Sequence, residues 1–319
     1  MNVTVNAVTL RLGSRRSPMA IAQSRLVAQQ IRDATGREVE ITGVTTLGDV
    51  SKAHLTQIGG TGVFVSALRE ALLNGEVDLA VHSLKDLPAI QPEDVALAAV
   101  PGRDDPRDAL VARDGAKLAD LPTGARVGTG SPRRAAQLLA LRADLRCVPI
   151  RGNADTRMAK IDAGELDAVV LAYAGLARIG RLDAVSQVFE PDEMLPAPGQ
   201  GALAVECRRA DTELVRLLAA VSDEFTMAAI TAERGLLEAL AAGCSAPVAA
   251  YAAGANNSLD MRAAVLSADG KTVLRAHGRG TAAHARRLGY DVAAELLRAG
   301  AAELIRVPQA PASTGNDAL

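Results

Sequence analysis

The sequence contains no tryptophan and only three phenylalanines and three tyrosines among its 319 residues. Proteins that bind nucleic acid stack aromatic rings on bases and use an excess of positive charge to hold phosphates. This chain has few such rings, and its formal net charge is −2 at pH 7. We therefore do not expect nucleic acid to be a partner.

Cysteine and histidine are also scarce. The three cysteines, Cys147, Cys207 and Cys244, form no C-x-x-C motif, and their odd number argues against a disulfide framework. The four histidines show no spacing typical of a zinc site, so we expect no bound metal. Cys147 and Cys207 lie in strand-like runs, which favours a place in the core.

The chain lacks an apolar run suited to a membrane. Its longest uncharged stretch, Ala239 to Leu259, contains Gly243, Pro247 and two asparagines, which makes it a poor candidate for a bilayer span. Residues 1–10 have no basic residue ahead of an apolar stretch, as a secretory signal would. We expect a cytoplasmic protein with no membrane partner.

What the sequence does have is positive charge at particular places. Arg133 and Arg134 directly follow a turn, Gly128 to Pro132. In an open α/β fold, the junctions between strands and the following helices gather along one crevice. Since arginine forks bind carboxylates and phosphates, the pattern predicts a small ligand that carries several such groups. Further basic residues stand at such junctions: Arg15, Arg16, Lys85, Arg151 and Arg157.

Strand-like and helix-like segments alternate twice along the chain, which predicts two α/β lobes with mixed sheets. Pro/Gly-rich stretches frame the second lobe, so the chain is expected to cross between the lobes twice, as a two-stranded hinge. The remaining segments are typical of a small α+β domain. The expected limits are 1–101 and 202–219 for the first lobe, 107–196 for the second, 222–308 for the C-terminal domain and 309–319 for a disordered tail.

Two helices have a recognisable start, because Ser17 and Ser131 each precede a proline. Serine at the N-cap and proline at the first helical position are typical of a helix N-terminus.

The stretch from Leu47 to Gly62 predicts a loop whose length is usual for functional or mobile segments. Further predicted strands are 3–12, 38–46, 77–82, 109–112, 125–128, 146–150, 168–172, 202–206, 247–253, 259–266 and 272–278, and further helices are 64–74, 154–163, 211–221, 224–241 and 282–298.

Three side chains are candidates for chemistry. Cys244 follows Gly243 after a predicted helix, where a thiol could be a nucleophile or an attachment point, although an inert cysteine is the commoner case. Asp86 ends a strand and could stabilise a developing cation, or only cap a turn. Lys85 could form a Schiff base, but a lysine beside an aspartate is normally a charged partner and not an amine with a lowered pKa.

Several segments together resemble the porphobilinogen deaminase family, also called hydroxymethylbilane synthase. The resemblance runs from about Leu10 to Val307. In this order and spacing the matching segments are very specific, although some are weak singly. They are Val81–Pro88 (VHSLKDLP), Gly128–Arg134 (GTGSPRR), Arg151–Asn153 with Thr156 and Arg157, Pro198–Gly201 (PGQG), and Gly243 with Cys244.

The resemblance implies three domains, the first two similar to periplasmic binding proteins. It also implies a dipyrromethane cofactor joined to Cys244 through a thioether. The family condenses four porphobilinogen units head to tail on this cofactor, releasing ammonia each time, and water then frees the linear hydroxymethylbilane. The loop at 47–62 matches a family segment that closes over the site. We expect a monomer in tetrapyrrole (haem) biosynthesis.

The resemblance also implies roles for individual residues. Asp86 is expected to be catalytic, by stabilising the electron-poor azafulvene that remains when ammonia leaves and the positive character of pyrrole N–H groups. Gly130, Pro132 and Ala177 depart from the residues common in the family. The residues expected to bind the cofactor are Cys244, Lys85, Ser83, Thr129, Ser131, Arg133, Arg134, Arg157 and Asp86, and those expected to bind substrate are Arg15, Ser17, Arg151, Arg157 and Arg178.

Two other interpretations remain. A non-catalytic, two-lobed protein that binds a small polyanion would share the arginines, but the absence of a signal peptide and the third domain with Cys244 argue against it. An enzyme that uses Lys85 to form a Schiff base is the second.

Overall fold

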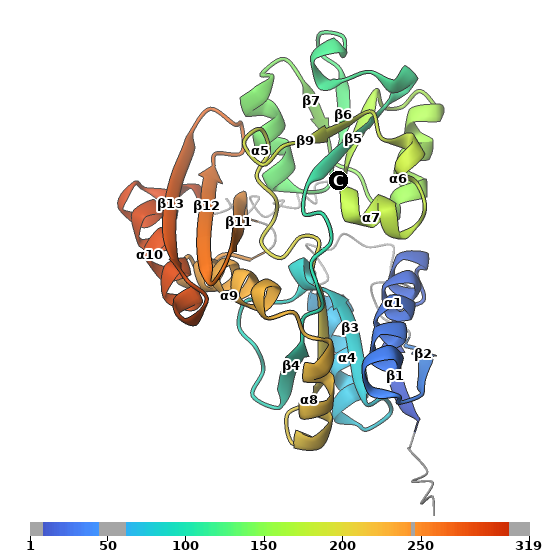
Figure 1. Cartoon of the computed structure of the whole chain (residues 1–319). Helices are drawn as coiled ribbons and strands as arrows, with labels where there is room; N and C mark the ends of the chain where they lie inside the picture. The colour runs from blue at the N-terminus through green and yellow to red at the C-terminus, as the bar shows by residue number, and fades with distance from the viewer. Residues whose placement is uncertain (1–8, 45–61, 244–245, 306–319) are drawn as a thin grey trace, which may run out of the picture.

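The computed structural model describes residues 9–44, 62–243 and 246–305, and places them in two lobes and a third domain (Figure 1). Residues 3–8 of the strand predicted for 3–12, most of the loop at 47–62, His54, Cys244 and the tail at 309–319 lie outside these residues, whereas the end of that strand is found as part of β1 (Leu10–Ser14). No helix in the described ranges is both long and apolar enough to cross a membrane.

The first lobe is built on a five-stranded sheet with the order β2-β1-β3-β10-β4. β1 runs parallel to β2 and β3, whereas β10 is antiparallel to β3 and β4, so the sheet is mixed. Helices α1 and α8 pack on one face and α4 on the other. The elements are β1 (Leu10–Ser14), α1 (Pro18–Thr35), β2 (Val39–Gly43), α4 (Gly62–Leu73), β3 (Leu79–Ser83), β4 (Val95–Ala99), β10 (Leu203–Arg208) and α8 (Thr212–Leu218).

The second lobe has a five-stranded sheet with the order β7-β6-β8-β5-β9. β6 is parallel to β7 and β8, and β5 is antiparallel to β8 and β9. α5 packs on one face, and α6 and α7 pack on the other. The elements are β5 (Asp108–Ala112), β6 (Arg126–Gly128), α5 (Pro132–Leu141), β7 (Arg146–Val148), α6 (Ala154–Asp162), β8 (Ala168–Ala172), α7 (Tyr173–Arg178) and β9 (Gln187–Phe189).

The two lobes share one plan, in which the parallel strands, starting from one edge of the sheet, are β2-β1-β3 in one and β7-β6-β8 in the other. The next strand in each sheet, β10 or β5, is the first strand after the chain has crossed from the opposite lobe. The crossings lie between β4 and β5 and between β9 and β10 (Figure 1). The predicted fold class, two mixed α/β lobes joined by two crossings with a small α+β domain, is confirmed. The predicted domain limits stay predictions.

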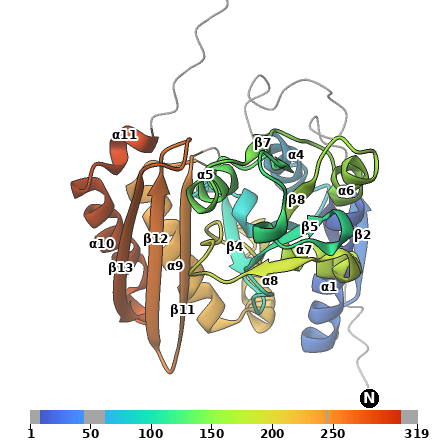
Figure 2. The ribbon, with the colours of Figure 1, turned by 90° about the horizontal axis from the view of Figure 1, so that it is seen from above.

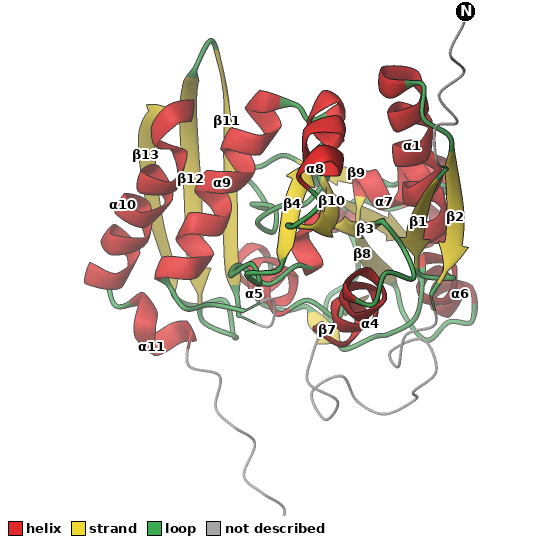
Figure 3. Ribbon diagram, turned by 90° about the horizontal axis from the view of Figure 1, so that it is seen from below, coloured by secondary structure: helices red, strands yellow, loops and turns green. Residues whose placement is uncertain are grey.

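The third domain is an antiparallel sheet, β11-β12-β13, covered on one face by helices (Figures 2 and 3). α9 and α10 approach closely, because Gly289 has no side chain: an added Cβ would lie 2.1 Å from the Ala232 carbonyl oxygen. The opposite face of the sheet contacts α5 through Ala136, Ala249 and Ala264. The elements are α9 (Glu224–Ala239), β11 (Val248–Ala255), β12 (Ser258–Leu266), β13 (Val273–Thr281), α10 (Ala285–Arg298) and α11 (Ala301–Ile305).

A buried ion pair joins the third domain to both crossings. Glu233, on α9, is fully buried and accepts from Arg103 of the first crossing through Oε1 at 2.6 Å and Oε2 at 3.2 Å. Its Oε2 also accepts from the backbone N–H of Gly199 in the second crossing at 2.6 Å. The third domain is therefore held against the same segments that connect the lobes.

The predicted helix starts at Ser17 and Ser131 are confirmed. The Ser17 hydroxyl accepts from the Ala20 N–H at 3.3 Å, and the Ser131 hydroxyl accepts from the Arg134 N–H at 3.4 Å. The sequence prediction did not include β4, β9, α7 or α11. Short 3-10 helices fill several connections: η1 (Leu84–Asp86), η2 (Arg113–Gly115), η3 (Leu118–Asp120), η4 (Leu182–Ala184), η5 (Ala219–Val221) and η6 (Ala282–His284).

Candidate active site

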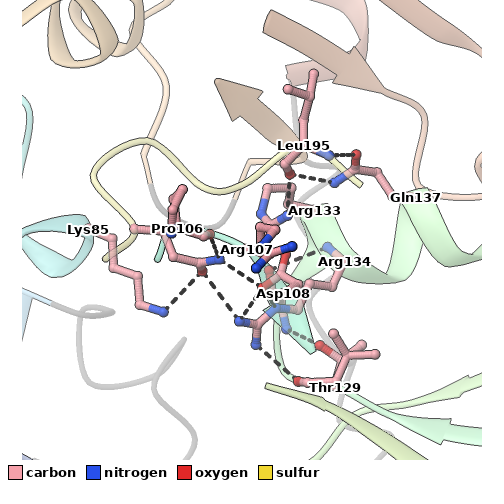
Figure 4. A network of polar contacts seen from close by, with 12 residues as sticks. Lys85, Pro106, Arg107, Asp108, Thr129, Arg133, Arg134, Gln137 and Leu195 are labelled. Atoms are coloured by element: carbon pink, nitrogen blue, oxygen red, sulfur yellow. Dashed lines mark hydrogen bonds and ion pairs between the residues drawn. The ribbon is translucent and has the colours of Figure 1, made fainter. Parts of the chain in front are cut away.

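The predicted site residues approach one another where the two lobes meet. The end of β3 leads directly into η1, which carries Lys85 and Asp86. The end of β6 leads through Thr129 and Ser131 into α5, which carries Arg133 and Arg134. Figure 4 shows Lys85 from the first lobe and these arginines from the second around one carboxylate, Asp108.

Asp108 is the centre of this network. It is fully buried at the start of β5 and accepts from Arg133 Nη2 at 2.7 Å, from Arg134 Nε at 2.9 Å and from Gln200 Nε2 at 2.9 Å. Burial alone would raise the pKa of Asp108, but the charges of Arg133 and Arg134 outweigh it and lower the pKa to about 2. Asp108 is therefore ionised and holds both guanidinium groups in place.

Arg133 is directed into the protein and is only 3% exposed. Besides Asp108, its guanidinium donates to the carbonyl of Leu195, which also accepts from Gln137 Nε2 at 3.0 Å. Its Nε has no hydrogen-bond partner among the described residues, and burial lowers the pKa of the group. Arg133 is thus anchored by the protein, with one donor left over.

Arg134 lies closer to the first lobe. Its Nη1 donates to the Val170 carbonyl at 3.1 Å, and its Nη2 lies 3.4 Å from Gln200 Oε1. Thr129 and Ser131 shape the turn ahead of the helix, because the Thr129 hydroxyl accepts from the Ser131 N–H at 3.2 Å. The predicted residues Thr129, Ser131 and Arg134 therefore belong to one short structural unit.

Lys85 reaches the same network from the opposite lobe. Its Nζ donates to Gln200 Oε1 at 3.3 Å. Burial and the nearby charge of Arg134 lower the pKa of Lys85 to about 8, although Asp86 and Asp108 oppose this effect. The expectation that this lysine keeps an ordinary pKa is wrong, since the sequence shows neither its burial nor the arginine across the lobe junction.

Asp86 is adjacent to Lys85 and half-buried. Its side chain makes no hydrogen bond with any other residue in the described part of the chain. Unlike Asp108, it forms no ion pair with an arginine of the described residues. Nearby Ser83 accepts from Gln23 Nε2 of α1 at 2.8 Å, and this bond fixes its hydroxyl.

The remaining predicted arginines fall into two groups. Arg157 donates to the Gly152 carbonyl at 2.8 Å, and its pKa is lowered first by burial and then by the charge of Arg134, so it lies near the network. Arg151 is exposed on the loop after β7, and Arg15, half-buried, lies with Ser17 between β1 and α1.

Arg178 has a different position. It lies at the end of α7, where its Nε donates to Asp104 at 2.8 Å and its Nη2 donates to the Gly201 carbonyl at 2.6 Å. Asp104 and Gly201 belong to the two crossings. Arg178 therefore ties the second lobe to both crossings, in addition to any contact it makes with substrate.

Two residues of this network, Asp108 and Gln200, were not predicted as site residues, although Gln200 lies in the Pro198–Gly201 segment that resembles the family. Gly199 and Gly201 place Gln200: both have positive φ (+77° and +88°), and an added Cβ would lie 2.5 Å from Leu84 Cδ2 and 2.4 Å from the Asp104 carbonyl oxygen, respectively. Only glycine allows this close approach. In the sequence, Gln200 could have been recognised as an amide side chain between two glycines. Asp108 could have been recognised as a single charged residue at the start of an apolar, strand-like run.

Cys244 lies outside the described residues. Its neighbours show where the segment joins the third domain: Ala242 and Ala246 are buried, Gly243 is exposed, and the Ala246 N–H donates to the Gly243 carbonyl at 3.0 Å. Of the other cysteines, Cys207 is buried in β10 and Cys147 is half-buried in β7. Burial raises the pKa of both thiols, which suits the predicted core positions.

The chemistry of this junction is that of an anion site. Lys85, Arg133, Arg134 and Arg157 are close together, and Asp108 is the one acidic group of the described residues that accepts hydrogen bonds from two of them. Such an excess of donors binds carboxylates or phosphates. Within the described ranges, no group of His, Cys, Asp or Glu residues could hold a metal ion.

Two mixed α/β sheets linked by two crossings, with cations gathered where the lobes meet, define a two-lobed α/β protein with a cationic junction between its lobes. The comparisons narrow this class. Residues 10–216 match the family model described as "Porphobilinogen deaminase, dipyromethane cofactor binding domain", and residues 227–298 match "Porphobilinogen deaminase, C-terminal domain". The chain belongs to the porphobilinogen deaminase family.

Curated relatives agree with this assignment. The chain is 59% identical over 304 residues to porphobilinogen deaminase of Thermobifida fusca (strain YX), which covers 92% of this chain and 95% of the relative. It is 55% identical over 309 residues to porphobilinogen deaminase 1 of Streptomyces coelicolor, covering 93% and 97%. Among solved structures, a periplasmic substrate-binding protein of an ABC transporter from Coxiella burnetii is similar with a TM-score of 0.42 and 17% identity, covering 66% of this chain and 91% of that one.

Proposed function

We propose that this chain is a transferase that condenses four porphobilinogen units head to tail, releases ammonia at each step and frees hydroxymethylbilane by hydrolysis. The family match, which covers both the cofactor-binding and the C-terminal regions, supports this activity. We also propose that it acts as a monomer in the cytoplasm, as part of tetrapyrrole biosynthesis.

The observation that carries the proposal is the excess of cations at the lobe junction. Three cationic side chains, Lys85, Arg133 and Arg134, lie around the single buried carboxylate of Asp108. Each pyrrole unit of the substrate carries an acetate and a propionate, so the growing chain is a polyanion. The surplus positive charge matches such a ligand, and a phosphate-bearing nucleotide is disfavoured because the sequence has no P-loop motif.

The residues at the junction also fit a dipyrromethane cofactor. We propose that Cys244 holds it through a thioether and that Lys85, Arg134 and Arg157 bind its carboxylates, with Ser83, Thr129 and Ser131 nearby. The unpartnered Nε of Arg133 offers one further donor at the same place. When bound, the cofactor supplies the pyrrole end to which the first substrate is added.

Asp86 is proposed as the catalytic carboxylate. Departure of ammonia leaves the substrate carbon electron-poor and places positive character on the ring nitrogen. A fixed carboxylate beside that nitrogen lowers the energy of this charged state and can accept or return its proton. Asp86 is suited to this role because no arginine of the described residues pairs with it, whereas Asp108 accepts hydrogen bonds from both Arg133 and Arg134.

Substrate binding is proposed for Arg15, Ser17, Arg151, Arg157 and Arg178. Arg178 is already bound to Asp104 and Gly201, so we propose that it acts mainly by holding the crossings and contacts substrate only with its remaining donor. Arg133, equally committed to protein acceptors, is proposed to support Arg134 more than to bind the ligand directly.

The intact mass of the purified protein tests the proposal. The wild type should be heavier than its sequence by one dipyrromethane unit, and Cys244→Ser should lose that mass. Cys147→Ser is the matched control, because it changes another cysteine and should keep the added mass. An active wild-type protein at its bare sequence mass would contradict the assignment.

One observation favours a second chemistry. Because the pKa of Lys85 is lowered to about 8, part of this amine is neutral at mildly alkaline pH and could attack a carbonyl. Borohydride reduction in the presence of substrate would then leave a stable mass on the peptide containing Lys85. We expect no such mass, since porphobilinogen has no aldehyde or ketone group.

A further inference from the structure

Gln200 is an amide at the centre of the lobe junction, and it is only 1% exposed. Its Nε2 donates to the Pro106 carbonyl at 2.6 Å and to Asp108 Oδ1 at 2.9 Å. Its Oε1 accepts from Lys85 Nζ at 3.3 Å and lies 3.4 Å from Arg134 Nη2. One side chain of the second crossing therefore contacts both lobes.

The orientation of this amide is determined by its partners. Both N–H groups of Gln200 are used by acceptors, Pro106 and Asp108, neither of which can donate in its place. The amide oxygen must then face the opposite way, toward the two cations. Because Gly199 and Gly201 fix the backbone on either side, the oxygen has little freedom to move.

A neutral acceptor has a specific advantage here. A carboxylate at this position would form ion pairs with Lys85 and Arg134 and cancel much of the charge that attracts an anionic ligand. An apolar side chain would leave both cations without this acceptor. An amide oxygen holds the two cations near each other while each keeps its charge and further N–H groups for a ligand.

We propose that Gln200 is a positioning residue that holds Lys85 of one lobe and Arg134 of the other together and keeps Lys85 protonated, so that both present donors to the same ligand carboxylates. The proposal rests on the proposed function only for the identity of that ligand. The effect of Gln200 on the Lys85 amine follows from the contacts alone.

The charged groups around Lys85 determine how this can be measured. Asp86 of η1 and Asp108 of β5 favour its protonated form, whereas Arg133 and Arg134 of α5, together with burial, oppose it. These opposing effects bring the pKa to about 8, and bound cofactor carboxylates would raise it, so the titration compares each variant with the wild-type holoenzyme. Replacing the amide oxygen should therefore move the titration in a direction that depends on the charge introduced.

The experiment compares Gln200→Glu and Gln200→Met in the full-length holoenzyme, with Gln137→Glu as the matched control. Gln137, in α5 of the second lobe, is a buried amide like Gln200, but it hydrogen-bonds to the backbone of Leu195 and not to Lys85. Trace acetylation over a pH series, read by peptide mass spectrometry, gives the titration of Lys85. The exposed Lys117 serves as internal reference.

Gln200→Glu should raise the pH of half-maximal acetylation of Lys85 by about one unit, because an anion replaces a neutral oxygen. Gln200→Met, which is nearly the same size, should lower it, and Gln137→Glu should leave it unchanged. The alkaline limb of kcat/KM should move in the same directions. In Gln200→Met, KM should rise about tenfold while kcat changes less, as expected from a lost charge-assisted contact.

A folded Gln200→Met variant with an unchanged Lys85 titration would overturn the proposal, and so would a Gln137→Glu variant that shifts Lys85 as much as Gln200→Glu does. Should Gln200→Glu fail to fold, the neutral Gln200→Met variant alone decides. Failure of the proposed function is separate, because it would appear as a wild-type protein that carries no dipyrromethane mass.

Discussion

Replacing Asp108 by asparagine should destabilise the second lobe and weaken the site at once. The substitution keeps the shape of the side chain but removes the negative charge between Arg133 and Arg134, which are 3% and 6% exposed. Two buried guanidinium groups would then lack a counter-charge. Removing one partner of a buried ion pair usually lowers the free energy of unfolding by about 3 to 5 kcal/mol, and we expect a decrease in this range.

The pH dependence gives an independent estimate. The folded-state pKa of Asp108 is about 2, below the value of 3.8 taken for a free aspartate. Ionised Asp108 therefore stabilises the fold above its unfolded-state pKa, and this stabilisation disappears as the pH falls from about 4 toward 2. The lowered pKa corresponds to a stabilisation of roughly 2 to 3 kcal/mol, at or slightly below the cost expected for the substitution.

Hydrogen exchange measured by mass spectrometry is the suitable assay, because it reports the stability of β5 and α5 separately from the other domains. Asp144→Asn is the matched control: Asp144 pairs with Arg142 just after the same helix, but on the surface, and its loss should change the exchange little. The reasoning would be refuted if Asp108→Asn protected α5 as well as Asp144→Asn does. Equal loss of protection in acid for Asp108→Asn and the wild type would refute it too.

Two further predictions concern the catalytic carboxylate and the third domain. Asp86→Asn should keep the dipyrromethane mass but lower kcat by at least about a hundredfold, since charge is lost and shape retained; steady-state rates near those of the wild type would show that another group acts. Glu233→Gln should leave the buried guanidinium of Arg103 without a counter-charge and lower the free energy of unfolding by about 3 to 5 kcal/mol. This should appear as faster hydrogen exchange around Gly199. Unchanged exchange there would show that the pair does not hold the crossings.

The sequence predicted best those elements that are defined by interactions between residues close together in the chain. Ser17 and Ser131 predicted the N-termini of their helices correctly, because an N-cap residue acts within one helical turn of its own position in the chain. β4 is a short edge strand (VALAA) that, among the described strands, pairs with β10 alone, more than a hundred positions away, and its own residues give little strand pattern. β9 is three residues long, too short to show a periodic pattern.

The sequence predicted which residues belong to the site better than it predicted their contacts with one another. The sequence indicated which arginines to consider, but not that Arg133 and Arg134 share Asp108, a residue distant in sequence. The ordinary pKa expected for Lys85 was wrong for the same reason, because burial and the effect of Arg134 arise only when the lobes meet. Contacts between distant segments cannot be read from a single local pattern.

The return of the chain to the first lobe through β10 has a consequence for synthesis on the ribosome. All five strands of the second sheet lie between residues 108 and 189, so that lobe can complete its sheet from one continuous piece of chain. The first sheet stays open until residues 203–208 emerge and enter between β3 and β4. The amino-terminal lobe, although translated first, is therefore the later of the two to close, and until then β3 and β4 expose strand edges that a chaperone or a neighbouring nascent chain can meet.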